Sequence, residues 1–110
     1  MPEQKIYYRY MSRKEADAVE KTGMLRGGRG AGVEETYWTD QLYGSAREAK
    51  ARLSLGRPPE IRVAFTIRNN PRLLEEGAPV EPDEGEPGGG TEWSTLDAVE
   101  VEVIAYEDID

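Results

Sequence analysis

Residues 61–68 alternate two sets of side chains with a period of two, and this pattern constrains the fold more than any other in the chain. Ile61, Val63, Phe65 and Ile67 alternate with Arg62, Ala64, Thr66 and Arg68. In a strand, successive side chains point to opposite faces, so the apolar set lies on a single face. The segment therefore predicts a half-buried strand, and the fold must include a sheet with one covered face.

Three other segments are expected to form strands. Residues 5–11 are rich in aromatic side chains, which favour a pleated surface, and they place Arg9 on the face opposite Ile6, Tyr8 and Tyr10. Residues 36–39 have the β-favouring sequence Thr-Tyr-Trp-Thr. Residues 99–103 alternate valine with glutamate, which predicts a last strand with one apolar face.

Two capping patterns predict short helices. Ser12 is followed three residues later by Glu15, and Gly23 supplies a left-handed stop, so we expect a helix over residues 12–22. Ser45 and Glu48 repeat this spacing. The second helix is expected over residues 45–55, where Gly-Arg-Pro-Pro at residues 56–59 ends it.

Two segments are predicted to lack regular structure. Residues 26–32 contain too many glycines to hold a helix or strand. Residues 69–90 are rich in proline, glycine and acidic side chains, which predicts a long surface loop. With 110 residues the chain is expected to form a single domain over residues 1–110, of the α+β class, with small helices packed on a mainly antiparallel or mixed sheet.

The composition excludes several kinds of chemistry. The chain has no cysteine and no histidine, which excludes Ser-His-Asp hydrolases, Cys-His proteases and zinc sites built on these residues, and we predict no metal. Its net charge of −8 argues against a nucleic-acid partner and favours a basic protein partner. No apolar run is long enough to cross a bilayer, and the N-terminus lacks the features of a signal peptide.

Three features compete as candidates for a functional site. They are Arg9 within a strand, the hydroxyl and aromatic cluster at residues 36–39, and Glu92, which follows a run of three glycines and a threonine. Each also has a purely structural interpretation, because charged residues in strands mostly face solvent and aromatic residues mostly belong to the core. Glu92 is the most suggestive, since the glycines allow the backbone to approach a ligand closely.

Four blocks of the sequence together resemble a known family. They are Tyr-Arg-Tyr-Met-Ser at residues 8–12, Thr-Gly-Met-Leu-Arg-Gly-Gly at 22–28, Tyr-Trp-Thr-Asp at 37–40 and Gly-Gly-Gly-Thr-Glu-Trp at 88–93. In this order they are similar to the ADP-ribosyltransferase domains of bacterial polymorphic toxins, in particular the TreTu group. The blocks span nearly the whole chain.

The resemblance implies a split β-sheet that binds NAD as substrate. It assigns Arg9, Thr39 and Glu92 to a first-strand arginine, a second-strand hydroxyl and a late-strand glutamate that meet around the nicotinamide ribose. Tyr10 beside Arg9 is expected to contribute to NAD binding, and Tyr37 or Tyr43 to stack on the nicotinamide ring.

The resemblance also implies partners and a location. The domain is expected to be the tip of a larger secreted toxin, to act in the cytoplasm of a target cell on a protein such as elongation factor Tu, and to be blocked by a cognate immunity protein. The absence of histidine points to the arginine-led branch of the superfamily. Many arginine-modifying members carry Glu or Gln two residues before the catalytic glutamate, whereas this chain has Gly90 there, so the acceptor is an arginine recognised differently or another side chain.

Two alternative functions remain open at the level of sequence. One is a histidine-free ribonuclease toxin, in which Arg9, Glu92 and a tyrosine perform acid-base and phosphate chemistry, although the acidic balance weighs against it. The other is a non-catalytic immunity protein or acidic binding module that docks on a basic partner. The acidic segment at residues 75–86 favours the second.

Overall fold

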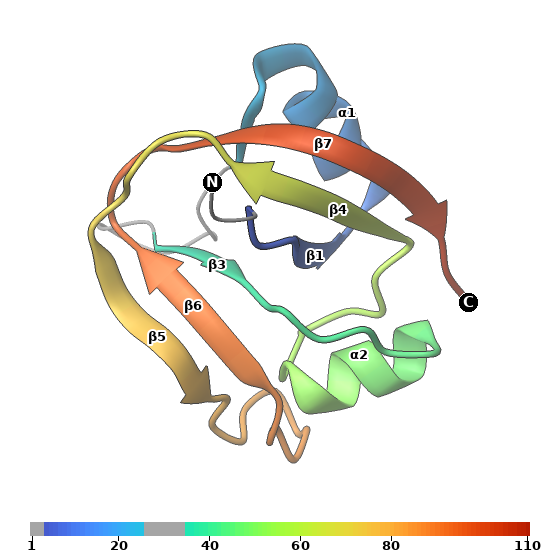
Figure 1. The fold of residues 1–110 in the computed structure, drawn as a ribbon. Coiled ribbons are helices and arrows are strands. Elements are labelled where there is room, and N and C mark those ends of the chain that lie inside the picture. Colours follow the sequence, from blue (N-terminus) through green and yellow to red (C-terminus); the bar gives the residue numbers. More distant parts are fainter. Residues whose placement is uncertain (1–3, 26–34) are drawn as a thin grey trace.

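The computed structural model describes residues 4–25 and 35–110, and in this part of the chain the strands form two separate β-sheets (Figure 1). The elements, in chain order, are β1 (Tyr7–Met11), α1 (Arg13–Thr22), β2 (Met24–Leu25), β3 (Thr36–Trp38), α2 (Ala46–Arg52), β4 (Ile61–Ile67), β5 (Leu73–Pro79), β6 (Thr91–Thr95) and β7 (Val99–Asp108). Together they make an α+β fold with antiparallel strand pairs, which confirms the predicted class.

The two sheets meet where β1 approaches the end of β3. One sheet has the strand order β1-β4-β7-β2 and the other β3-β6-β5. Tyr8 and Thr39 join them through a pair of backbone hydrogen bonds, in which each N–H donates to the other residue's carbonyl at 2.7 and 2.9 Å. Strand β1 lies at the edge of its sheet. Side chains from both faces of β1 therefore lie close to the junction of the two sheets.

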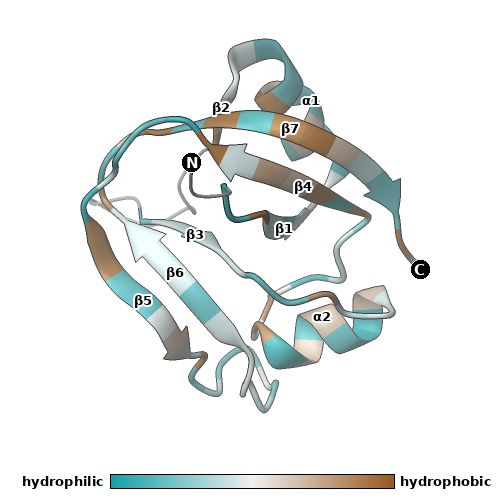
Figure 2. Ribbon diagram, in the orientation of Figure 1, coloured by the Kyte–Doolittle hydropathy of each residue, from teal (hydrophilic) through white to brown (hydrophobic). Residues whose placement is uncertain are grey.

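The main core lies between α1 and the inner face of the four-stranded sheet and extends to the three-stranded sheet. Its buried residues are Met11, Ala16, Val19, Leu25, Trp38, Ile61, Val63, Phe65, Val99 and Val101. Figure 2 shows hydrophobic and hydrophilic residues alternating in the first part of β7, as expected for a strand with one buried face, whereas β6 contains no strongly hydrophobic residue.

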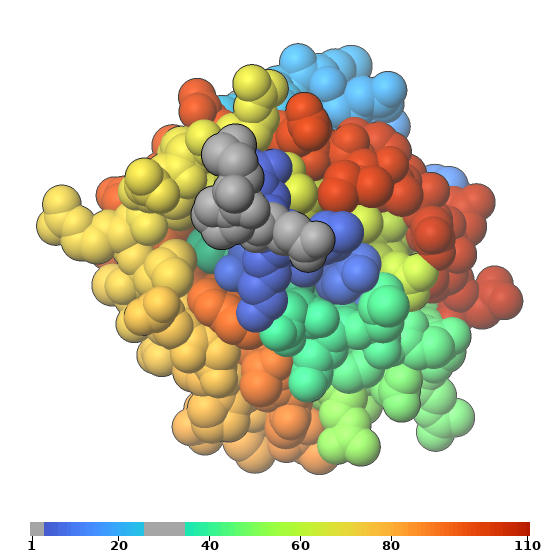
Figure 3. Space-filling view, viewed as in Figure 1, coloured from blue at the N-terminus to red at the C-terminus, as the bar shows by residue number. Residues whose placement is uncertain are grey.

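A second apolar cluster supports α2 on the other side of β1. Tyr10, Tyr43 and Ala49 form its buried part, and Tyr8 packs against them. The alternation along β1 therefore separates Tyr8 and Tyr10 from Tyr7 and Met11, which face the main core. On the face shown in Figure 3, the first described residues before β1 lie against the segment after β3 and against β6, where Lys5 pairs with Asp40 and covers the ring of Trp93.

Both helices begin where their capping patterns predict. Ser12 and Ser45 accept hydrogen bonds from the backbone N–H groups of Glu15 and Glu48, and Gly23 ends α1 in the left-handed region. Helix α2 is shorter than predicted and ends at Arg52 rather than near residue 55. The last two carbonyls of the helix, those of Ala51 and Arg52, accept from the backbone N–H groups of Gly88 and Gly90, so both are satisfied without a further turn.

The expectation of a structureless loop over residues 69–90 is wrong, because β5 occupies Leu73–Pro79. This strand pairs with β6 along one edge of the smaller sheet and is interrupted by two irregularities in register. Its side chains are mostly exposed, so no period-two pattern marks it, and an edge strand tolerates Pro79. The predicted glycine-rich loop at residues 26–32 lies outside the described residues.

Candidate active site

A cleft of about 580 Å³ opens along the junction of the two sheets. Its walls come from β1, from β3 and Thr39, from residues 53–56 after α2, from residues 80–84 after β5, and from Glu92 on β6. This volume lies within the usual range for small-molecule sites, which is roughly 300–1,000 Å³. The cleft is therefore large enough to hold much of a dinucleotide.

The structure brings most of the predicted site residues to this cleft. Arg9, Tyr10, Tyr37, Thr39 and Glu92 all line it. These residues come from segments that are far apart in sequence. Strands β3 and β6 pair directly, and the bridge between Tyr8 and Thr39 brings β1 next to them.

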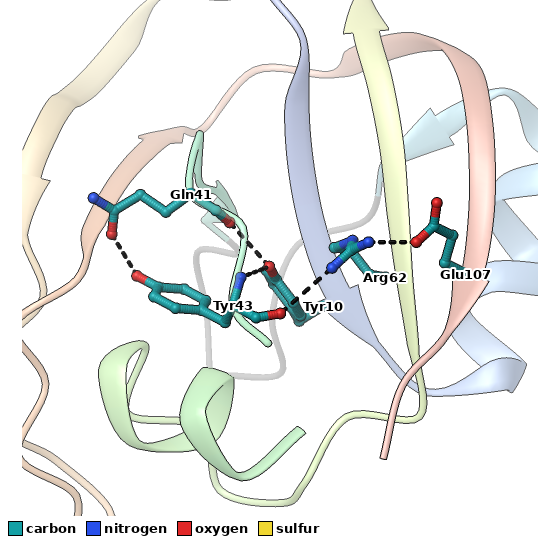
Figure 4. A network of polar contacts seen from close by, with 5 residues as sticks. All are labelled: Tyr10, Gln41, Tyr43, Arg62 and Glu107. Carbon is teal, nitrogen blue, oxygen red and sulfur yellow. Dashed lines mark hydrogen bonds and ion pairs between the residues drawn. The ribbon is translucent and has the colours of Figure 1, made fainter. Parts of the chain in front are cut away.

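Tyr43 is the predicted residue that does not line the cleft, and its placement does not support a role in stacking on nicotinamide. Its side chain is buried behind Tyr10, with the two rings 5.6 Å apart. Figure 4 shows the polar contacts that hold this pair: Tyr10 donates to the carbonyl of Gln41 at 2.9 Å and accepts from the N–H of Tyr43 at 2.7 Å, and the Tyr43 hydroxyl donates to the Gln41 side chain. Tyr43 is thus a support for the cleft wall.

Arg9 places a positive charge in the wall of the cleft. Its side chain is 14% exposed, and Nη2 lies 3.5 Å from a carboxylate oxygen of Glu15 on α1. Burial lowers the pKa of the Arg9 guanidinium, and the charge of Glu15 partly opposes that shift. Arginine remains charged at neutral pH even so, and a planar guanidinium is suited to bind phosphate with two parallel hydrogen bonds.

Thr39 and Tyr37 line the cleft from β3 and the residue that follows it. Thr39 is 1% exposed, and its hydroxyl accepts the N–H of Gln41 at 3.2 Å. The side chain of Tyr37 is 40% exposed, which leaves much of its ring available to a ligand. Partial burial, a hydrogen bond to Glu35 and the charge of that carboxylate raise the pKa of Tyr37 to about 12, so its phenol stays protonated at neutral pH.

Glu92 is held in the cleft by the glycine turn that precedes it. The N–H of Gly88 donates to Ala51 at 2.9 Å and the N–H of Gly90 donates to Arg52 at 3.0 Å, which ties the start of β6 to the end of α2. A Cβ atom at residue 90 would lie 2.3 Å from the Tyr43 hydroxyl and 2.9 Å from the carbonyl oxygen of Arg52. This packing explains why the position two residues before Glu92 carries no side chain.

The carboxyl group of Glu92 is partly withdrawn from water. Burial raises its pKa first, and the negative charges of Glu75 and Glu35 raise it further. A carboxylate that is ionised in a partly desolvated site interacts strongly with a positive charge that forms beside it. The same environment makes the ionised form unfavourable for the folded protein.

We therefore expect Glu92→Gln to increase the free energy of unfolding at neutral pH. The folded-state pKa is raised, so the stabilisation linked to Glu92 is complete below the unfolded pKa and is lost as the pH rises through the folded pKa. The gain should be present at pH 7 and should vanish near about pH 4, where the protonated acid resembles the amide. Urea unfolding of both proteins at the two pH values measures it. An equal gain at both would contradict this origin, and Glu102→Gln on exposed β7 is the matched control.

Several residues of the cleft were not anticipated from sequence. Glu15 was identified only as a helix-capping residue, and Glu81, Asp83 and Glu84 fell in the segment expected to be a loop. These carboxylates and Glu92 make the cleft strongly acidic, and Arg9 is the one Lys or Arg among the described residues that line it. No local pattern signals this arrangement, because it depends on how the turn after β5 packs against residues 53–56.

The comparisons provide no relative to guide the assignment: no protein-family model, curated protein or solved structure matches this chain. Within residues 4–25 and 35–110, neither helix has the length and hydropathy required to span a membrane. The same residues contain no group of three or more acidic side chains arranged to hold a metal ion.

Proposed function

We propose that this domain is a mono-ADP-ribosyltransferase that cleaves NAD and transfers ADP-ribose to a protein. The observation that carries the proposal is that Arg9 and Glu92, which are 83 positions apart (92 − 9), line the same cleft together with Thr39. The junction of a four-stranded and a three-stranded sheet supports the finer assignment of the fold as an ADP-ribosyltransferase-like split sheet.

Each residue has a role that follows from its chemistry. Arg9 binds the pyrophosphate of NAD through its guanidinium. The bond between the ribose C1′ and the nicotinamide nitrogen breaks, its electron pair leaves with neutral nicotinamide, and positive charge develops on the ribose. The carboxylate of Glu92 stabilises that charge more strongly in the transition state than in the ground state.

The remaining residues orient the substrate. Thr39 positions the ribose or Glu92 with its hydroxyl, Tyr37 offers an exposed ring for stacking on nicotinamide, and Tyr10 braces the wall beside Arg9. A nucleophilic atom of the acceptor then forms the new bond to C1′ and releases a proton to water.

The biological setting is part of the same proposal. The domain acts as the toxic tip of a larger secreted protein used in competition between bacteria, enters the cytoplasm of the target cell, and modifies a protein such as elongation factor Tu. A cognate immunity protein blocks the cleft in the producing cell. The acidic rim formed by Glu81, Asp83 and Glu84 offers a surface on which a basic inhibitor can dock.

Labelling with biotinylated NAD tests the proposal directly. The domain is incubated with biotinylated NAD and a bacterial lysate, and transferred biotin is detected after gel electrophoresis. A discrete labelled protein that is absent with Glu92→Gln and present with Glu102→Gln supports the proposal. An absence of both labelling and nicotinamide release overturns it.

The acidic cleft also supports a second candidate, a non-catalytic module that binds a basic protein. The same rim of Glu81, Asp83 and Glu84 would provide complementary charge, which chiefly increases the rate of association. This candidate predicts tight binding of a basic protein with no consumption of NAD. Measuring nicotinamide release in the same reaction separates the two functions.

Glu15 is expected to weaken NAD binding because its negative charge competes with the NAD pyrophosphate for the Arg9 guanidinium. Glu15→Gln keeps the shape of the side chain and removes a charge 3.5 Å from the guanidinium. We expect the dissociation constant for NAD to fall by up to about fivefold at low salt, since Glu15 is 53% exposed and solvent screening limits its ion pair with Arg9 to about 1 kcal/mol. The difference should shrink at high ionic strength.

Isothermal titration calorimetry at two salt concentrations measures this effect. Glu20→Gln on the same helix is the control, since Glu20 is exposed and does not line the cleft. Weaker NAD binding by Glu15→Gln would show instead that Glu15 orients Arg9 for the ligand, which is the opposite role.

A further inference from the structure

Three carboxylates and a phenol gather on one face of the three-stranded sheet, next to the cleft. Ser94 on β6 is paired with Tyr37 on β3 and with Glu75 on β5, and Glu92 lies two residues before Ser94 on the same strand. Directly paired residues and residues two apart project from the same side of a sheet. Glu35 precedes β3 and forms a hydrogen bond with Tyr37, and we call the set Glu35, Tyr37, Glu75 and Glu92 the acidic face.

The members of the acidic face interact electrostatically. Glu75 and Glu35 both raise the pKa of Glu92, and all three carboxylates raise the pKa of Tyr37. Within residues 4–25 and 35–110, none of the ion pairs in the structure joins one of these three carboxylates to Lys or Arg. The repulsion among them would be relieved by a cationic ligand.

Ser94 gives an independent indication that a polar ligand binds at this face. Its side chain is fully buried between Tyr37 and Glu75 in the register, and its hydroxyl has no hydrogen-bond partner in the described part of the chain. A buried hydroxyl without a partner carries a desolvation penalty, and a ligand that forms a hydrogen bond with it would relieve that penalty. Because Ser94 is paired with both Tyr37 and Glu75, its unpartnered hydroxyl lies among the residues of the acidic face.

We propose that the acidic face binds the guanidinium group of an acceptor arginine, and that Glu75 is the residue that determines this specificity. A planar guanidinium presents several N–H donors in a fixed fork, which matches acceptors on neighbouring strands better than the compact ammonium of lysine does. Glu75 is suited to the role because it is exposed on β5, whereas Glu92 must remain available to the ribose.

The transfer step that follows rests on the proposed function. A guanidinium nitrogen forms the bond to the ribose C1′ as the bond to nicotinamide breaks, nicotinamide leaves with the electron pair, and the arginine nitrogen loses one proton to water. Glu75 acts by holding the guanidinium beside Glu92, so its removal should affect acceptor use far more than hydrolysis of NAD by water.

Two matched pairs make the test specific. The ligands are Nα-acetyl-arginine methylamide and the corresponding citrulline compound, which has the same shape without the charge. The variants are Glu75→Gln and Glu76→Gln, which remove the same charge from adjacent exposed positions of β5, although Glu76 does not affect the pKa of Glu92. Binding is followed by NMR with ¹⁵N-labelled protein, and the reaction by nicotinamide release and formation of ADP-ribosylated arginine compound.

The arginine compound is expected to shift the amide signals of Ser94 and Glu75 with a dissociation constant on the order of millimolar, and the citrulline compound to leave them unchanged. Glu75→Gln should weaken this binding by about fivefold and lower transfer to the arginine compound similarly. Glu76→Gln should behave as the unmodified protein.

The outcomes separate this inference from the proposed function. Equal binding of the two ligands, or equal behaviour of the two variants, overturns the assignment of Glu75 even if NAD is cleaved. Binding of the arginine compound that depends on Glu75, in a protein that releases no nicotinamide, supports the guanidinium site and overturns the transferase proposal.

Discussion

Glu92→Gln is expected to reduce the rate constant kcat for nicotinamide release from NAD by a factor of about 10² to 10³, the range seen when one group that stabilises developing charge is removed. The amide retains the size of the carboxylate and can still accept a hydrogen bond from a ribose hydroxyl, but it carries no negative charge. The loss should therefore appear in kcat, with KM nearly unchanged, because the interaction is made chiefly in the transition state. Chromatographic measurement of nicotinamide over a range of NAD concentrations provides both constants.

A comparison with Arg9→Lys identifies which step each residue serves. Lysine keeps the charge but replaces the two parallel hydrogen bonds with a point charge, so this variant should mainly raise KM. Glu102→Gln, at an exposed position of β7, should leave both constants unchanged. A Glu92→Gln protein that keeps more than about a tenth of the original kcat would show that another group stabilises the ribose cation.

The strands with a buried face and the helices with paired caps were the parts of the fold that could be predicted. Residues 61–67 alternate because one face of β4 packs in the core, and the serine and glutamate of each cap satisfy backbone groups locally. These signals lie within a few residues of each other in the sequence. These elements can therefore be recognised from the sequence without knowledge of the tertiary structure.

Strand β5 could not be predicted because its stability comes from its partner. Both of its faces are largely exposed and it contains Gly77 and Pro79, so its composition resembles that of a loop. The hydrogen bonds to β6 define it as a strand, and they depend on pairing between residues that are 12 (91 − 79) to 22 (95 − 73) positions apart in the sequence. The same pairing places Glu75 beside Glu92.

Only part of the candidate site could be predicted from the sequence, for a similar reason. Arg9, Thr39 and Glu92 were identified through motifs, and the structure brings them to one cleft. Glu15 and Tyr43 were interpreted less well, because the interactions that define their roles are tertiary. Glu15 reaches back to Arg9 from the first turn of α1, and Tyr43 is turned into the protein by its contacts with Tyr10 and Gln41.

Gly88→Ala is expected to reduce the free energy of unfolding by about 2 to 5 kcal/mol, because two costs add at this residue. The backbone has φ of +70°, which an L side chain rarely adopts, and a Cβ atom there would lie 2.5 Å from the carbonyl oxygen of Val80 and 2.9 Å from the backbone of Glu81. These contacts are with backbone atoms, so relief requires the turn to move. The N–H of Gly88 bonds to Ala51, so such a shift would also loosen the end of α2.

Gly85→Ala separates the steric cost from the conformational one. Gly85 has a similar φ of +74°, but a Cβ atom added there would meet no atom within 4 Å. It should therefore lose only about 1 to 2 kcal/mol, the cost of a left-handed conformation alone. Equilibrium unfolding in urea measures both variants, and equal losses would mean that the turn before β6 adjusts freely. In that case the position of Glu92 would not depend on the packing of the glycine turn, and the steric account of Gly88 would be wrong.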